Sequence, residues 1–219
     1  MSGKFIILEG LNGCGKTTQA HHLCRKLPAS YFHELGSHST SSFPNLLKRL
    51  LHMDDLSEVT EQYFITGSRS RNLQYVQHML DLGANVVYDR YVYSSHIYSH
   101  REVQYQPETT DAVWDLHDTI KNNPVPTVTI ILDIDPDEQK RRLRHRKDLD
   151  KYEKVSDQVI EYRRNVYLAM GRAKSNNYVV NGMLPEESVH LQNFPDLMIY
   201  RLFWKHSICL LYTSPSPRD

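Results

Sequence analysis

Short apolar runs alternate with longer segments of helical periodicity along most of the chain. A run such as Phe5-Ile6-Ile7-Leu8 is typical of a strand that is buried on both faces of a sheet. The glycine-rich segment Gly10–Gly15 follows this run and predicts a turn. The pattern predicts five strands, of which the second is the weakest, at Lys4–Glu9, Ala29–Glu34, Asn85–Asp89, Val128–Asp133 and Tyr178–Val180.

Helical patterns fill most of the segments between these strands. Pro28 and Gly83 are expected to close two of the helices, because proline cannot continue a helix and glycine favours its end. The expected helices run from the glycine-rich turn to about Lys26, from Pro44 to about His52, over Leu56–Leu82 and over Glu153–Lys174.

Two local patterns refine the later helices. The segment Asp135-Pro136-Asp137-Glu138 predicts a capped helix start, with Asp135 at the N-cap and Glu138 reaching back to it. Within Glu153–Lys174, apolar side chains recur at helical spacing and predict the stripe that faces the sheet. This stripe consists of Val155, Val159, Tyr162, Val166 and Met170.

Strands that alternate with helices are joined by crossovers, and crossovers favour a parallel sheet. The sequence therefore predicts an α/β fold, with one five-stranded parallel sheet and helices on both of its faces. We find no internal repeat and no internal linker, and we expect a single domain over residues 1–191.

Composition narrows the classes of function. The chain has 219 residues, and 26 Lys and Arg balance 26 Asp and Glu, whereas a nucleic-acid binder usually carries a basic excess. The sequence contains no run of about 18 apolar residues that could cross a bilayer, and no signal-peptide cleavage site precedes the first apolar run. Three cysteines give neither a CxxC pair nor an even disulfide framework. We therefore expect a cytoplasmic protein, the nucleus also being open, without a membrane or nucleic-acid partner.

The end of the chain needs a separate interpretation. Residues 209–219, from Cys209 to Asp219, match the translation of a common transposase-library sequencing adaptor, and we interpret them as not native. On this interpretation the natural C-terminus is missing. Residues 192–208 have no clear pattern, and unspliced or frame-shifted sequence would account for them.

The first strand–helix junction carries a phosphate-binding motif. Residues Gly10 to Thr17 fit G-x-x-x-x-G-K-[ST], directly after a buried strand and at the start of a helix. Backbone N–H groups and the helix dipole bind phosphate there. We expect Lys16 to face solvent and reach the β- and γ-phosphates of ATP, and the Thr17 hydroxyl to bind Mg²⁺. The predicted ATP-binding residues of this loop are Asn12, Gly13, Cys14, Gly15, Lys16, Thr17 and Thr18.

A second candidate group lies at the carboxyl end of the third strand, where doubly wound sheets bind their ligands. This group is Asp89-Arg90-Tyr91. Asp89 is placed to share the Mg²⁺ site, and Arg90 is placed to face an acceptor phosphate.

Two longer segments, Phe5–Gln19 and Asp89–Tyr98, resemble the two signatures of the thymidylate kinase family. The similarity continues through Leu149-Asp-Lys-Tyr-Glu153 to the last strand. It implies a nucleoside-monophosphate kinase fold, transfer of the ATP γ-phosphate to dTMP, and a homodimer.

The resemblance also assigns residues to the acceptor nucleotide. Arg90 matches an arginine near both phosphates, and Arg69 matches the long-helix arginine that engages the dTMP phosphate or base. Ser95 matches a contact to the pyrimidine, and Tyr98 matches the ring that lies against C2′. Solvent exposure of Arg69 and ordinary packing of Tyr98 are the alternatives.

A basic run before Leu149 matches the family's lid, over about residues 136–152. Because neither Gly13 nor Cys14 supplies an arginine from the phosphate-binding loop, a lid arginine is expected to neutralise the transferring phosphoryl group. Arg146 is our first choice, and Arg142, also predicted to contact ATP, is the second.

Several positions depart from the family pattern. Asn12 replaces the aspartate that serves the deoxyribose 3′-hydroxyl, and its amide oxygen is expected to accept that proton. His33-Glu34-Leu35-Gly36 stands where the family has Arg-Glu-Pro-Gly or Phe-Pro-x-Arg, so we expect the site of the acceptor phosphate to be one arginine short, with Glu34 still a candidate for substrate binding. Phe64, with an offset of one residue to Ile65, approximates the phenylalanine that stacks on the base. Two alternatives therefore remain open: a kinase for another nucleoside or nucleotide, and a catalytically weakened nucleotide-binding relative.

Overall fold

The computed structural model describes residues 2–35, 42–53, 55–99, 107–146, 149–186 and 188–189, with side chains from residue 112 in the fourth of these ranges. The segment 192–208 and the adaptor-like segment 209–219 lie outside these ranges. Our interpretations of both segments stay predictions.

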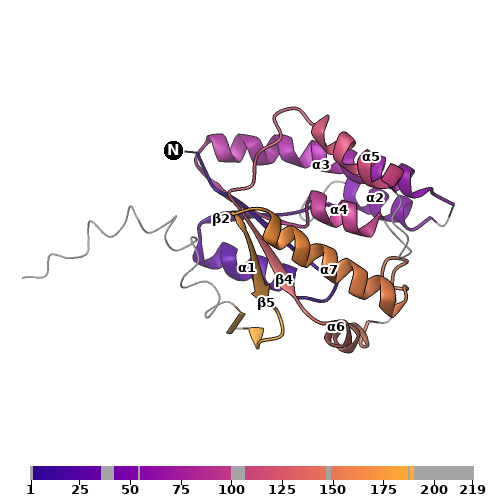
Figure 1. The fold of residues 1–219 in the computed structure, drawn as a ribbon. Helices are drawn as coiled ribbons and strands as arrows, with labels where there is room; N and C mark the ends of the chain where they lie inside the picture. Colours follow the sequence, from indigo (N-terminus) through magenta and orange to yellow (C-terminus); the bar gives the residue numbers. More distant parts are fainter. Residues whose placement is uncertain are drawn as a thin grey trace, which may run out of the picture.

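A five-stranded parallel sheet forms the centre of the molecule, in the order β2-β3-β1-β4-β5 (Figure 1). All six residues of β1 are buried, as its apolar sequence predicts. The fold class and all five strands predicted from the sequence are confirmed, with ends shifted by at most one residue. The strands are β1 (Phe5–Gly10), β2 (Ala29–His33), β3 (Asn85–Asp89), β4 (Val128–Asp133) and β5 (Asn177–Asn181).

Seven helices occur in the described part of the chain. They are α1 (Lys16–Lys26), α2 (Phe43–Leu51), α3 (Glu58–Asp81), α4 (Val92–Tyr98), α5 (Pro107–Asp118), α6 (Pro136–Leu143) and α7 (Asp157–Ala173). Of these, α1, α2 and α3 lie where the periodicity predicts them. No helix among the described residues is long and apolar enough to cross a membrane.

The strand order determines which face of the sheet each helix covers. The connection from β1 to β2 runs in one direction along the sheet, and the later connections run in the other. Since parallel crossovers are right-handed, α1 packs on one face, and α3, α4, α5 and α7 pack on the opposite face. Figure 1 shows α3, α4 and α5 grouped together, with α7 beside α4. The neighbouring strands β1 and β3 thus send their connections to opposite faces, which opens a crevice at their carboxyl ends.

The start of α7 differs from the prediction. The helix begins at Asp157 rather than at Glu153, because Ser156 acts as its N-cap and accepts a hydrogen bond from the Val159 N–H. The preceding residues form a turn in which Asp150 accepts hydrogen bonds from the backbone N–H groups of Tyr152 and Glu153. A local capping signal therefore starts the helix later than the apolar periodicity suggests.

The stripe of α7 that packs on the core is also rotated from the predicted one. Of the predicted stripe only Val159 is fully buried, and Tyr162, Val166 and Met170 lie at the margin of the buried face. The face itself is formed by Val159, Ile160, Arg163, Tyr167 and Gly171. Because this buried face includes an arginine and a glycine, a pattern based on apolar residues alone placed the stripe about one residue away from it.

Two helices were not predicted from the sequence, and one predicted cap contact does not form. The helices α4 and α5 carry aromatic, serine and β-branched residues with weak helix propensity, and tertiary packing stabilises them. At α6, the Asp135 side chain caps the helix as predicted, by accepting from the Glu138 N–H at 2.7 Å. Glu138 itself does not reach back but pairs with Arg141 and Arg142.

Gly10, the last residue of β1, occupies a conformation that other residues avoid. Its φ of 137° lies outside the regions open to L side chains. A Cβ atom added there would lie 2.4 Å from the Leu132 carbonyl oxygen of β4. This close approach lets the chain turn from the sheet into the glycine-rich loop.

We expect Gly10→Ala to lower the free energy of unfolding by about 2 kcal/mol or more, because it adds both strain and a backbone clash. Gly67→Ala is the matched control, because Gly67 lies on an exposed turn of α3 with open space at its Cβ. The free energy of unfolding of this control should rise by about 0.5–1 kcal/mol. Urea unfolding of both variants measures the difference, and equal stabilities would contradict the role of Gly10.

Candidate active site

A cavity of about 690 Å³ opens at the carboxyl ends of β1, β2 and β3. The glycine-rich loop and the start of α1 line one end, and residues of α3 and α4 line the other. Residues from α6 and the following turn, including Arg142, Arg146 and Glu153, complete the wall. The cavity therefore lies at the crevice that the strand order creates.

The phosphate-binding loop leads into α1 with the geometry that the motif predicts. Gly15 takes a left-handed conformation (φ 97°) immediately before the helix. The first turn of α1 has neither a side-chain cap nor an acidic residue, so its N–H groups and the helix dipole favour an anion. Thr17 and Thr18 are exposed and line the cavity together with Gly13 and Gly15. Cys14 is buried and lies outside the lining.

Lys16 does not face solvent, and the expectation that it would is wrong. The side chain is only 5% exposed, and Nζ donates hydrogen bonds to the carbonyl oxygens of Gly10 (2.9 Å) and Leu11 (2.7 Å). Nζ also lies 3.4 Å from Cys14 Sγ. The ammonium group binds to its own loop, because the wrapped backbone directs carbonyl oxygens to the position next to it.

Thr17 and Asp89 come together as the motifs predict. The Thr17 hydroxyl donates to Asp89 Oδ2 at 2.7 Å, and Tyr31 donates to the same oxygen at 3.2 Å. Asp89 is buried, and its Oδ1 has no hydrogen-bond partner among the described residues. Carboxylate and hydroxyl oxygens are the ligands that Mg²⁺ prefers. The unpartnered oxygen beside Thr17 therefore fits a magnesium site.

Arg90 follows β3 in a left-handed conformation (φ 69°), which is uncommon for a residue other than glycine. Its backbone N–H donates to the Leu8 carbonyl oxygen at 3.0 Å, so the chain turns while still bonded to β1. The guanidinium donates to Ser94 Oγ at 2.9 Å and to Asn12 Oδ1. Backbone strain at this position is a feature typical of functional sites.

Asn12 connects the phosphate-binding loop to both sides of the cavity. Its Oδ1 accepts hydrogen bonds from Arg90 and from the Tyr98 hydroxyl, and that hydroxyl accepts from the Asn12 N–H at 3.0 Å. Its Nδ2 donates to Glu153 Oε1 at 3.1 Å. The amide oxygen expected to serve the 3′-hydroxyl is thus already bonded within the protein.

Tyr98 lies in the cavity wall, close to two cations. The ring centroid is 5.1 Å from Arg90 Cζ and 4.6 Å from Arg163 Cζ. Arg163 is itself buried and donates to the Tyr152 carbonyl oxygen at 2.6 Å. Ring and hydroxyl contacts together fix the position of Tyr98.

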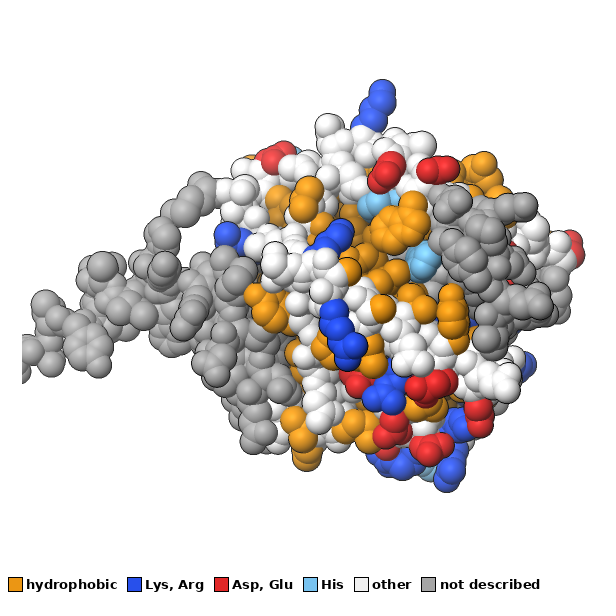
Figure 2. Space-filling view, viewed as in Figure 1, with side chains coloured by type: hydrophobic (Ala, Val, Ile, Leu, Met, Phe, Trp, Pro, Cys, Tyr) orange, Lys and Arg blue, Asp and Glu red, His pale blue; other side chains and the backbone are white. Residues whose placement is uncertain are grey.

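The two candidate lid arginines are held differently. Arg142 donates to the carbonyl oxygens of Gly13 and Gly182 and to Glu138, so its guanidinium is fixed beside the phosphate-binding loop. Arg146 is 55% exposed and pairs with the buried Glu153 at 2.6 Å. Basic and acidic side chains mingle over α6 in Figure 2, which agrees with a mainly solvated charge run.

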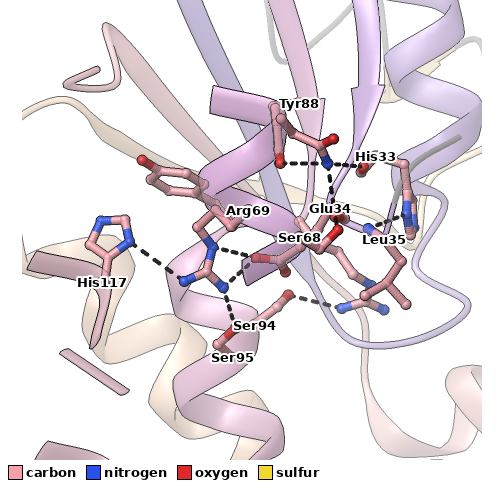
Figure 3. Close-up of polar contacts among 12 residues, drawn as sticks. His33, Glu34, Leu35, Ser68, Arg69, Tyr88, Ser94, Ser95 and His117 are labelled. Carbon is pink, nitrogen blue, oxygen red and sulfur yellow. Dashed lines mark hydrogen bonds and ion pairs between the residues drawn. The ribbon is translucent and has the colours of Figure 1, made fainter. Parts of the chain in front are cut away.

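Arg69 lies behind the wall of the cavity rather than in it. The side chain is fully buried, which excludes the solvent-exposed alternative. It donates to Glu34, with Nε 2.5 Å from Oε1, and to the Ser95 hydroxyl (Figure 3). Glu34 and Ser95 line the cavity, and Arg69 does not. Arg69 therefore orients two wall residues.

The predicted stacking residue is displaced by one position. Ile65 and Gln62 line the cavity, whereas Phe64 does not. One helical position corresponds to a turn of about 100°, which is enough to direct Phe64 away.

His33 lines the cavity as a neutral residue. Burial lowers the pKa of His33 to about 4, with Arg90, Lys48 and Lys16 adding to this effect and Asp89 opposing it. Its Nδ1 accepts a hydrogen bond from the Leu35 N–H at 3.2 Å. His33 therefore supplies no positive charge at the position where the resemblance implies an arginine.

Sequence reasoning missed several residues of the site. Glu153 belonged to a segment quoted for the resemblance, but its contact with Asn12 joins residues far apart in the chain, and its contact with Arg146 depends on the turn that precedes α7. Gln62 and Arg163 gave no signal, because single polar residues on a helix are usually exposed. Glu9 is completely buried behind Arg90 and accepts hydrogen bonds from the Tyr91 and Ser94 N–H groups.

Comparisons with known proteins agree with this geometry. A model of the thymidylate kinase family matches residues 8–193. A probable thymidylate kinase of Methanococcus vannielii is 31% identical over 155 residues, which are 71% of this chain and 72% of the relative. A thymidylate kinase of Alteromonas mediterranea is 30% identical over 196 residues, with 87% of each chain covered. The solved structure of thymidylate kinase from Candida albicans has a TM-score of 0.71 at 20% identity, covers 94% of this chain and 93% of its own, and has the same fold.

Burial of Glu9 leads to a prediction for stability against pH. Desolvation raises the pKa of Glu9 to about 7, although hydrogen bonds from Ser94 oppose it. The folded state keeps a proton on Glu9 up to about pH 7, whereas the unfolded state releases it near pH 4.5. The free energy of unfolding therefore falls as the pH rises from 4.5 to about 7. For this change in pKa, the total loss in the free energy of unfolding is about 3 kcal/mol.

Glu9→Gln should remove this loss, so that its free energy of unfolding exceeds that of the natural chain increasingly from pH 5 to pH 8. Urea unfolding at each pH measures the difference between the two proteins. Glu161→Gln, on an exposed position of α7, is the control and should follow the natural chain. A Glu9→Gln curve parallel to that of the natural chain would contradict the prediction.

Proposed function

We propose, from the premise that the chain belongs to the thymidylate kinase family, that it transfers the γ-phosphoryl group of ATP to dTMP and releases ADP and dTDP. One observation carries the proposal. Arg90, at the end of β3, contacts Asn12 in the phosphate-binding loop, so a single cation lies between the end of the cavity suited to ATP phosphates and the end suited to an acceptor. Phosphoryl transfer depends mainly on such positioning and on charge stabilisation.

At the donor end, the phosphate-binding loop would hold the ATP phosphates through its backbone N–H groups. Lys16 would exchange its carbonyl partners for phosphate oxygens, which is favourable because a charge-assisted bond to an anion is stronger than a bond to a neutral carbonyl. Thr17 and Asp89 would hold Mg²⁺, whose chemistry when bound is to neutralise phosphate charge. The unpartnered Asp89 Oδ1 supports this assignment.

At the acceptor end, Arg90 would face the phosphate of dTMP, and Ser95, Glu34 and Tyr98 would form the wall around the nucleoside. The buried Arg69 would act through Glu34 and Ser95. Tyr98, held by its contacts with two cations and with Asn12, presents a rigid surface suited to excluding a ribose hydroxyl. Ile65 replaces Phe64 as the residue proposed to lie against the base.

Arg146 remains our choice for the lid arginine that stabilises the transferring group. Arg142 is already bound by two carbonyl oxygens and a carboxylate. Arg146 is largely exposed, and Glu153 is its one side-chain partner among the residues that the structure describes. Release from Glu153 would allow Arg146 to turn toward the phosphates, where a lid arginine contributes mainly in the transition state.

Two further features follow the family resemblance. We propose a homodimer, and a cytoplasmic location where ATP is available. ADP release measured with dTMP, dUMP, CMP, AMP and thymidine as acceptors tests the function. Turnover that is fastest with dTMP is the expected result; preference for another acceptor, or no turnover with any of them, would overturn it.

Lys16→Met should lower kcat/KM by at least about 100-fold, because it keeps the volume of the side-chain stem and removes the charge that stabilises the transferring phosphoryl group. Lys26→Met, at an exposed position in the last turn of the same helix, is the control and should keep full activity. Steady-state kinetics and thermal melting of both variants separate catalysis from folding. A loss of less than about tenfold would contradict the role of Lys16.

Arg146→Ala should lower kcat by about 10²–10³-fold and change the KM for ATP little, by analogy with arginine fingers. The matched control is Arg144→Ala, in the same basic run and exposed, which should keep the natural kcat. A larger loss in Arg142→Ala would show that Arg142 is the catalytic arginine.

A further inference from the structure

A second cavity, of about 450 Å³, lies on the side of the sheet covered by α4, α5 and α7. Tyr91, Trp114, His117, Asn123, Lys174 and Asn177 are among the residues that line it. His117, in the last turn of α5, is 7% exposed and separates this cavity from the buried Arg69. The cavity thus reaches the acceptor end of the active site from behind.

His117 belongs to a closed ring of contacts. Arg69 Nη1 lies 3.5 Å from His117 Nδ1, and His117 Nε2 lies 2.8 Å from Asn123 Nδ2 (Figure 3 for the first contact). Asn123 Oδ1 lies 2.5 Å from the Tyr91 hydroxyl, and the Tyr91 ring faces the Arg69 guanidinium at 5.7 Å. The ring therefore begins and ends at Arg69.

Hydrogen-bond chemistry fixes the proton on His117. Arginine has donors only, so Nδ1 must be the acceptor, and a neutral imidazole then carries its proton on Nε2. An Nε2–H needs an acceptor, which Asn123 provides if its amide is turned by 180°, since the two ends of an amide are nearly the same shape. The turned amide donates to the Tyr91 oxygen, so both nitrogens of His117 and both ends of the Asn123 amide have a partner of the right kind.

We propose that His117, neutral and protonated on Nε2, is a positioning residue that holds Arg69 against Glu34 and Ser95 and so shapes the acceptor end of the active site. The second cavity gives a small imidazole access to this position. The proposal rests on the proposed phosphorylation of dTMP for its kinetic readout, but its proton assignment can be measured without turnover.

The surrounding charges favour the neutral ring. Burial, together with Arg69 of α3 and Lys174 beyond the end of α7, lowers the pKa of His117 to about 4, and Asp118 opposes this effect. The aromatic side chains of Tyr91 and Trp114 meet the imidazole edge to face and provide no charge. Protonation would direct a second donor at Arg69, so the contact exists only with the neutral form.

A purely structural histidine would act differently from a positioning one. If His117 only filled space, its removal would lower stability and leave the kinetics of the folded protein unchanged. If it positions Arg69, its removal lowers kcat/KM for dTMP and leaves the KM for ATP unchanged, because Arg69 acts on the acceptor wall alone.

The experiment uses the full chain with His117→Ala. We expect kcat/KM for dTMP to fall about tenfold at pH 7.5, and 50 mM imidazole to restore most of it. Restoration should increase with pH as free imidazole loses its proton near pH 7. N-Methylimidazole accepts a hydrogen bond but cannot donate one to Asn123, and it should restore less. His78→Ala, an exposed histidine of α3, is the control and should respond to neither compound.

Two further measurements keep the proposal open to refutation. In the natural chain, ¹⁵N NMR of labelled histidine should show His117 protonated on Nε2 between pH 5.5 and pH 8. If His117→Ala fails to fold, His117→Gln, which keeps an acceptor and a donor, should retain more than half of kcat/KM. An Nδ1-protonated ring, an unchanged kcat/KM in His117→Ala, or no response to imidazole would overturn the proposal, whereas a natural chain without dTMP turnover would overturn the proposed function alone.

Discussion

The parallel pairing of β1 with β3 is the constraint on which the site depends. The two strands run in register as far as Leu8 and Asp89, and the Arg90 N–H then adds one more bond to the Leu8 carbonyl. Beyond this point the chains separate toward opposite faces of the sheet. The phosphate-binding loop and Arg90 are therefore held at a fixed distance by backbone geometry, and Asn12 needs only a short side chain to join them.

Three ionisable side chains are buried behind the site. Glu9, Arg69 and Arg163 are almost completely inaccessible to solvent, and each is held by hydrogen bonds from different elements of the fold. Buried charges cost desolvation energy and are weak contributors to stability. Their contribution here is orientation, because each contacts a residue of the cavity wall or its backbone. The buried ionisable groups thus lower the stability of the protein, and they fix the orientation of the residues in the cavity wall.

The sequence predicted the parts of the structure that depend on local pattern. Strands with continuous apolar runs, the Asp135 cap and the glycine-rich loop all follow from neighbouring residues. Contacts between distant segments do not, so the partners of Asn12 were not predictable. The carbonyl partners of Lys16 lie in its own loop, but they depend on how the loop wraps in space, which the motif does not specify. The face of α7 was misplaced for the same reason, since its buried Arg163 has a tertiary partner that no periodicity records. The identity of the site residues was thus easier to predict than their burial and their hydrogen-bond partners.

The self-bound Lys16 has a consequence for ligand discovery. A compound that enters the phosphate-binding loop must displace the Lys16 ammonium group from two carbonyl oxygens. A neutral molecule forms no charge-assisted bond with both partners ionised, so it does not compensate for the hydrogen bonds that Lys16 loses. Fragment screens on the ligand-free protein will therefore favour the acceptor end of the cavity. Donor-site inhibitors would have to carry an anionic group, which limits passive entry into cells.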